Sequence, residues 1–119
     1  MPERPSMHWE RSPAELSERF AAVTDGHPEI ARRKMFGEIA GFVNGNMVTG
    51  LHSGRWFVRL VGDEQSAALA LPGAARFEPM AGRPMGDYFV LPPGVVEDDR
   101  ALSEWLEKAI AVGKSLKPK

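Results

Sequence analysis

The sequence contains no cysteine, no long hydrophobic run and no excess of charge of either sign. The absence of cysteine excludes disulfides, thiolate metal sites and thiol catalysis. No apolar run approaches the roughly 18 residues of a membrane-spanning helix, and the first residues carry charges where a signal peptide is apolar. The formal net charge of −1 is unlike that of strongly basic nucleic-acid-binding domains. We therefore expect a cytoplasmic protein that does not bind membranes.

The composition that remains is that of an ordinary globular protein. Of its 119 residues, 43% are hydrophobic and 26% are charged, which is typical of one folded domain. Residues 1–11 are rich in charge and contain prolines, so we expect them to form a flexible N-terminal arm. Residues 12–113 are predicted to form the single domain, and residues 114–119 a frayed basic tail.

Three segments have helical signals. A capping box that begins at Ser12 predicts a first helix, because its hydroxyl could accept a hydrogen bond from a free amide of the first turn. Residues 62–73 predict a short second helix between turn-forming residues. A broad apolar stripe over residues 99–112 predicts a third helix, capped by Asp98 or Asp99.

The remaining apolar segments have strand signals. Residues 33–61 predict a three-stranded antiparallel meander with turns at Asn44-Gly45 and Ser53-Gly54, since these dipeptides favour tight hairpins. Residues 75–80 and 87–92 predict two further strands. The resulting order is α-β-β-β-α-β-β-α, which indicates an α+β fold with helices packed on an antiparallel sheet of about five strands.

The third strand of the meander should have two different faces. Trp56, Val58 and Leu60 alternate with Phe57 and Arg59, and alternate residues of a strand point to opposite sides of the sheet. We expect the tryptophan side to face the core and the arginine side to face solvent. Gly41 and the other strand glycines are predicted to mark bulges or close backbone approaches.

Two segments of the sequence resemble a known family. The run "ARRKMFGEIAGFVNGNMV", the run "FEPMAGRPMGDYFVLP" and the closing amphipathic helix are similar to the TfoX N-terminal domain family, which is named after the competence regulators TfoX and Sxy. The resemblance covers about residues 14–113, and its most specific parts are R-K-M-F-G and M-x-G-R-P-M.

The resemblance implies an α+β fold akin to that of secretion chaperones, with the element order predicted above. Full-length competence regulators carry a second, helical domain, and this chain corresponds to a standalone N-terminal domain. The family supplies no established catalytic residues.

Catalytic and metal-binding patterns are not found in the sequence. His8, His27 and His52 have no metal-ligand spacing, and we expect them on the surface or in turns. No nucleophile stands beside a recognisable base, and no glycine-rich loop leads into a helix as a phosphate site requires. We therefore predict no enzyme activity, no metal and no cofactor.

The loop "MAGRPMGDYFVLP" offers the best candidate binding residue. Arg83 lies between a glycine and a proline, and Pro84 favours an extended conformation for it. A pocket lined by Phe36, Met80, Arg83 and Tyr88 could hold a small ligand. We favour instead a structural role in which Arg83 braces the loop through a salt bridge or a carbonyl.

A second candidate surface is basic. Arg32, Arg33 and Lys34 form a basic run, and the strand at 55–59 carries two arginines beside Phe57. Basic residues interleaved with an aromatic ring could hold a single nucleic-acid strand. The balanced net charge argues against this use, because such a patch would have to be segregated in space.

The function expected from the sequence is therefore binding. We predict a non-catalytic protein-interaction or regulatory module that acts as a homodimer or binds another protein, because antiparallel sheets have edges that partners often cover. The alternatives are a nucleic-acid-linked regulator of transcription or competence, and a small-ligand-binding domain.

Overall fold

A computed structural model describes residues 12–35, 37–79, 82 and 85–119. The helices are α1 (Ala14–Asp25), α2 (Asp63–Leu69), α3 (Pro93–Val96) and α4 (Asp99–Ser115). The strands are β1 (Ala31–Met35), β2 (Glu38–Val43), β3 (Asn46–His52), β4 (Arg55–Arg59), β5 (Ala75–Arg76) and β6 (Tyr88–Leu91).

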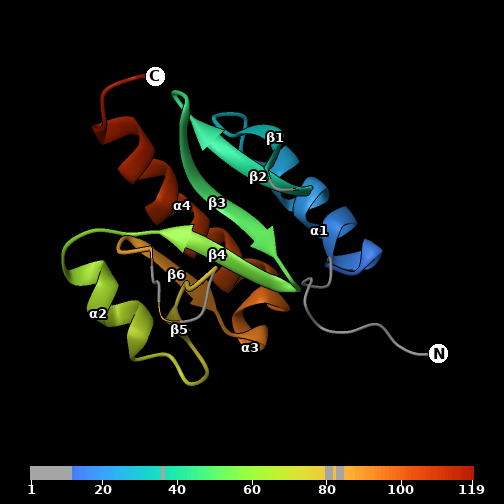
Figure 1. Ribbon diagram of the computed structural model, residues 1–119, viewed down its shortest axis with the longest axis vertical. Helices are drawn as coiled ribbons and strands as arrows, with labels where there is room; N and C mark the ends of the chain where they lie inside the picture. The colour runs from blue at the N-terminus through green and yellow to red at the C-terminus, as the bar shows by residue number, and fades with distance from the viewer. Residues whose placement is uncertain (1–11, 36, 80–81, 83–84) are drawn as a thin grey trace.

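The strands form one antiparallel sheet with the order β1-β2-β3-β4-β6-β5. Helix α4 crosses behind β3 and β4, and α1 lies beside β1 and β2 (Figure 1). The sheet with helices packed on one side confirms the predicted α+β class.

The sheet has one strand more than the expected number. The segment predicted as the first strand is two strands, β1 and β2, which pair with each other across a turn at Gly37. Gly37 has a φ of +80°, a left-handed conformation that glycine adopts without steric cost. The predicted strand at 75–80 is shortened to β5, and the short helix α3 was not predicted.

The two predicted hairpin turns are confirmed. Asn44 and Gly45 have φ values of 53° and 81°, and Ser53 and Gly54 have φ values of 50° and 81°. Two consecutive positive φ angles are the mark of a type I′ turn, whose twist matches that of the strands it joins. These turns fix the register of β2, β3 and β4 and so decide which side chains share a face.

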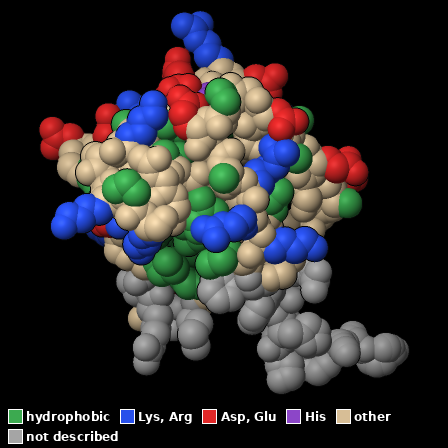
Figure 2. Space-filling model, turned by 90° about the horizontal axis from the view of Figure 1, so that it is seen from above, with side chains coloured by type: hydrophobic (Ala, Val, Ile, Leu, Met, Phe, Trp, Pro, Cys, Tyr) green, Lys and Arg blue, Asp and Glu red, His purple; other side chains and the backbone are tan. Residues whose placement is uncertain are grey.

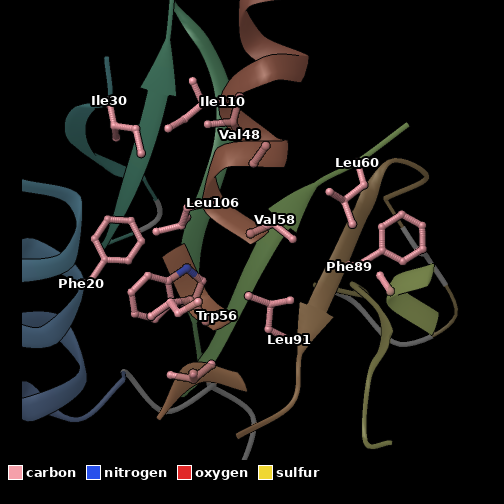
Figure 3. Close-up of a cluster of buried hydrophobic side chains, with 14 of the residues drawn as sticks. Phe20, Ile30, Val48, Trp56, Val58, Leu60, Phe89, Leu91, Leu106 and Ile110 are labelled. Carbon is pink, nitrogen blue, oxygen red and sulfur yellow. The ribbon is translucent and has the colours of Figure 1, made fainter. Parts of the chain in front are cut away.

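The main core lies between the sheet and the helices, as Figure 3 shows. Trp56, Val58 and Leu60 are buried in it, as predicted, and the Phe20 ring of α1 lies 4.8 Å from the Trp56 ring, centroid to centroid. Each of the four helices contributes a buried side chain to this core: Phe20, Ala68, Val96 and, from α4, Leu102, Leu106, Ala109 and Ile110.

The predicted capping box at the start of α1 is wrong. Pro13 is the N-cap residue, and no side chain caps the helix. Ser12 instead ties α1 to the sheet: its backbone N–H donates to Glu38 Oε1 at 3.2 Å, and its hydroxyl accepts a hydrogen bond from Gly54 N–H at 2.9 Å. Contacts with residues distant in sequence therefore replace the local cap.

The C-terminal part of the domain consists of α4 and the segment that follows it. Asp98 caps this helix, because its carboxylate accepts hydrogen bonds from the backbone N–H groups of Arg100 and Ala101. Beyond the helix, the Lys119 N–H donates to the Asn44 carbonyl at 2.8 Å. The segment predicted as a frayed tail is thus hydrogen-bonded to the β2–β3 hairpin. The predicted N-terminal arm lies outside the described residues.

Within the described part of the chain, no helix is both long enough and apolar enough to cross a membrane.

Candidate functional site

One face of the sheet carries a second hydrophobic cluster, and no described helix contributes to it. Its buried members come from β4, β6 and the segment after β5, and they are Phe57, Phe77, Tyr88 and Val90. Met47 and Met85 are partly buried and pack against them. The sequence prediction placed the Phe57 side of β4 in solvent, and this is wrong for Phe57, which is 4% exposed. Phe77, from a distant segment, covers it.

The aromatic rings of this cluster are packed against one another. The rings of Phe57 and Phe77 are stacked with centroids 4.4 Å apart, and Tyr88 meets Phe57 edge to face at 5.5 Å. The Tyr88 hydroxyl donates to the Met47 carbonyl at 2.8 Å, and burial raises the pKa of Tyr88. The cluster is therefore a fixed platform on the helix-free side of the sheet.

Arginines lie over aromatic rings on the same face. The guanidinium carbon of Arg33 is 4.0 Å from the Phe42 ring centroid, that of Arg59 is 5.5 Å from the Tyr88 ring, and that of Arg55 is 6.0 Å from the Phe77 ring. Such contacts hold a guanidinium in place and leave those of its N–H groups that have no other partner available to an anion. Arg55 Nη2 also lies 3.4 Å from His52 Nδ1.

The register confirms that these side chains share a side. Residues that are paired across antiparallel strands point the same way. The pairing runs from Arg33 to Ala40, from Ala40 to Gly50 and from Gly50 to Phe57. Arg59, two residues from Phe57, is paired with Tyr88. We call the set Arg33, Phe42, Arg55, Phe57, Arg59, Phe77 and Tyr88 the arginine–aromatic face.

The charge on the arginine–aromatic face is unevenly compensated. Arg59 forms an ion pair with Asp87 at 3.3 Å, whereas neither Arg33 nor Arg55 forms an ion pair with a described carboxylate. Seen from above, the molecule also has a patch of hydrophobic side chains with Lys and Arg side chains around it (Figure 2). Among the described residues, the positive charge of the arginine–aromatic face is therefore only partly compensated.

Of the predicted ligand-pocket residues, only Tyr88 is among the described residues. Phe36, Met80 and Arg83 lie outside them, so the structural role of Arg83 stays a prediction. Tyr88 is 8% exposed and its hydroxyl is hydrogen-bonded, so it belongs to the platform rather than to an open pocket wall.

The predicted basic run does not form a single patch. Arg33 points to the arginine–aromatic face, whereas Arg32 and Lys34 point to the other side of β1. The Arg32 guanidinium is held by α1: it donates to the Asp25 carboxylate at 2.7 Å and to the Thr24 hydroxyl at 3.0 Å. Only Arg33 of the three joins the candidate surface.

A groove of about 660 Å³ lies at one end of the sheet. Apolar side chains of α1, β4, β6 and α3 form its floor, including Leu16, Trp56, Leu91 and Val96. Arg19 also lines it, but its Nε donates to the Val96 carbonyl at 2.8 Å and its Nη2 pairs with Asp99 at 2.9 Å. This groove is distinct from the pocket predicted around Tyr88. Arg55 and Arg76 also line it, whereas Arg19 braces α1 against α3 and α4.

Both described histidines are buried, so the predicted surface position is wrong for both. His27 does lie in the connection between α1 and β1, as a turn position would require, whereas His52 ends β3. His27 is 7% exposed, with Nδ1 3.0 Å from Glu107 Oε2. His52 is 8% exposed and meets the Phe77 ring edge to face at 5.4 Å. Among the described residues, no three histidine, aspartate or glutamate side chains gather as a metal site would require.

Protonation of His52 should make the free energy of unfolding depend on pH. Burial, with a smaller contribution from Arg55, lowers the pKa of His52, while Glu38 opposes this shift. In the unfolded chain His52 has an ordinary pKa of about 6.5. As pH falls below that value, the unfolded chain therefore binds more protons than the folded chain does. Stability should therefore decrease as pH falls through about 6.5 and level off below the folded-state pKa.

Urea unfolding of the native protein and of His52→Gln between about pH 5 and pH 8 tests this expectation. The difference in unfolding free energy between the two proteins should change with pH by no more than about 1.4 kcal/mol per pH unit, in favour of the variant at low pH. A difference that is constant over this range would contradict it.

Sequence reasoning missed Phe42 and Phe77 as parts of the candidate site. Phe42 joins it through the pairing of β1 with β2, and the prediction did not separate these strands. Phe77 joins through the pairing of β5 with β6, since the Phe77 N–H donates to the Tyr88 carbonyl at 2.9 Å. The sequence did contain one cue for Phe77: the two neighbouring segments predicted as strands, 75–80 and 87–92, both contain aromatic residues.

Comparison with known proteins places the chain in a family. Searches of curated proteins and of solved structures gave no match. The family model of the TfoX N-terminal domain matches residues 21–112, a span that holds the whole sheet and nearly all of α4. The chain belongs to the TfoX N-terminal domain family.

Proposed function

We propose that this domain is a non-catalytic protein-interaction module whose binding surface is the arginine–aromatic face. The observation that carries the proposal is the placement of Arg33 and Arg55 over aromatic rings, without ion pairs to described carboxylates. Arginine held in this way loses little side-chain freedom on binding, and it is common at the centres of protein interfaces. A regulatory role would be exerted through this binding.

The hydrogen bonds of Glu38, at the start of β2, and of Tyr88, on the face, support binding rather than catalysis. Both carboxylate oxygens of Glu38 accept backbone hydrogen bonds, from Ser12 at 3.2 Å and from Ser53 at 2.7 Å. The Tyr88 hydroxyl is bonded to a carbonyl. A general acid or base must be able to reach the reacting proton, and these groups are already engaged in holding the fold.

Nucleic acid is the second candidate partner, suggested by the same arginines. Binding of a single strand would use exposed rings for base stacking. Phe57 and Phe77 are 4% and 3% exposed and stack on each other, so they offer no free ring face to a base. The geometry therefore favours a protein.

Self-association stays a prediction, and the charges limit how it can occur. Two copies joined through the arginine–aromatic face would bring Arg33 and Arg55 toward the same residues of the other copy, and like charges across an interface disfavour association. Light scattering at micromolar protein tests the homodimer directly. A dimer would have to use another surface, such as the groove or the helices.

The proposal is tested by affinity capture from the native cell extract with four baits: the native domain, Arg33→Glu, Arg55→Glu and Arg100→Glu. Arg100 is the matched control, because its side chain is 90% exposed on α4, within the helical layer, and the charge change is the same. A protein retained by the native and Arg100→Glu baits but lost from both face variants supports the proposal.

Two results would contradict it. One is a partner retained equally by all four baits. The other is capture of nucleic acid that disappears steeply with added salt, which is the signature of phosphate contacts. Thermal unfolding of each bait first establishes that the variants are folded.

A further inference from the structure

Strand β1 is the accessible edge of the sheet. It lies at one end of the strand order, and its residues 31–34 are all exposed. The opposite edge is β5, which has only two residues. An edge strand presents unpaired backbone N–H and C=O groups that can receive another strand, and five residues offer more of them than two.

The side chains of this edge are strongly basic. Arg33 projects to the arginine–aromatic face, and Lys34 projects to the other side, where it has no ion pair with a described carboxylate. Arg32 is already held by Asp25. The one acidic residue paired with β1 is Glu38, which is buried and accepts two backbone hydrogen bonds. A strand added here would therefore meet positive charge on both sides.

These charges disfavour a second copy of β1 as the added strand. An antiparallel pair of β1 strands centred on Arg33 would set Arg33 opposite Arg33 and Arg32 opposite Lys34. A pair centred on Arg32 or on Lys34 would set that residue opposite its own copy. Like charges directly opposite on neighbouring strands are destabilising.

We infer that β1 receives an extended, acidic segment of a partner protein, which adds to the sheet as a seventh strand. Main-chain hydrogen bonds to β1 hold the segment, and its Asp or Glu side chains lie beside Arg33 or Lys34. The same basic residues that repel another β1 select an acidic strand. This inference rests on the proposed function and names the chemistry of the partner.

The probe is the peptide acetyl-Thr-Glu-Val-Glu-Val-Glu-Thr-amide, and its control is the same peptide with lysine in place of each glutamate. Both are titrated into the isotope-labelled chain of 119 residues, and amide hydrogen exchange is followed by NMR. The glutamate peptide should slow exchange of the outward-pointing amides of β1 by about tenfold or more, because strand addition pairs them. The lysine peptide should leave them unchanged.

A charge-reversed chain gives the complementary test. In the double variant Arg33→Glu, Lys34→Glu, the lysine peptide should protect the β1 amides and the glutamate peptide should not. Arg100→Glu serves as the control and should respond as the native chain does. If the double variant fails to fold, the exchange measurement on the native chain decides the question.

Several results would overturn the inference. One is resonance shifts on the arginine–aromatic face without β1 protection, and another is protection of β1 by self-association in the absence of peptide. A third is protection by an oligouridine at least equal to that by the glutamate peptide. Absence of peptide binding at millimolar concentration, with partner capture still dependent on Arg33 and Arg55, would reject strand addition while leaving the proposed function in place.

Discussion

Replacing Trp56 with alanine is expected to lower the free energy of unfolding by about 3–5 kcal/mol. The side chain is 1% exposed and lies at the centre of the main core, against Phe20. Its removal takes a large apolar surface out of the core and leaves a cavity that the surrounding side chains fill only in part.

Trp56 also takes part in a buried chain of hydrogen bonds. Its indole N–H donates to the Thr49 hydroxyl at 2.9 Å, and that hydroxyl donates to the Phe57 carbonyl at 2.7 Å. Thr49 is fully buried, so no bulk water replaces the lost donor. This bond contributes about 1 kcal/mol, which is less than the packing of the ring.

Urea denaturation of three variants separates these contributions. Trp56→Phe keeps an aromatic ring without the N–H and should lose less stability than Trp56→Ala. Val61→Ala removes a side chain that is 47% exposed and should change stability by no more than about 0.5 kcal/mol. A loss below about 1.5 kcal/mol for Trp56→Ala would contradict the placement of this ring in the core.

Replacing Gly113 with valine should lower the free energy of unfolding by about 1–3 kcal/mol. A Cβ atom at this position would lie 2.6 Å from Val43 Cβ and 2.9 Å from Val48 Cγ1. These neighbours belong to β2 and β3, and their side chains are short and branched, so they cannot move away without shifting the strands. The absence of a side chain at Gly113 thus allows α4 to pack closely against the β2–β3 hairpin.

The matched control is Gly94→Ala in α3, where a Cβ atom would have no neighbour within 4 Å. This change should leave stability unaltered or raise it by up to about 1 kcal/mol, because alanine restricts the unfolded chain. Thermal or urea unfolding of both variants is sufficient. A Gly113→Val protein as stable as the native one would show that α4 does not approach the sheet this closely.

Much of the fold follows from local signals in the sequence. The dipeptides Asn44-Gly45 and Ser53-Gly54 specify their turns through backbone conformation alone, and both have the expected positive φ angles. Gly41, predicted to mark a bulge or a close approach, has both: the register shifts beside it, and a Cβ atom there would lie 2.7 Å from the Ile30 side chain.

The remaining features depend on contacts between residues far apart in sequence. Ser12 has the local pattern of a helix cap, but its N–H and hydroxyl bond to Glu38 and Gly54 instead. Those partners come within reach only after β2 and the β3–β4 turn are in place. Local pattern therefore predicted the helix but not the role of its first polar residue.

The candidate site was predictable only in part for the same reason. Alternation along β4 correctly separated Trp56 from Phe57, but it could not supply Phe77, which lies 20 residues further along the chain and stacks on Phe57. The basic run at 32–34 was visible in the sequence, but the contact of Arg33 with Phe42 depends on the pairing of β1 with β2 across the turn at Gly37.

The central claim is that the arginine–aromatic face binds a protein partner. The most direct test is the dissociation constant of the purified, captured partner for the native domain, Arg33→Glu, Arg55→Glu and Arg100→Glu. Each face variant should weaken binding by about tenfold or more, equivalent to about 1.4 kcal/mol, while Arg100→Glu binds as the native domain does. Equal affinity for all four proteins would contradict the claim.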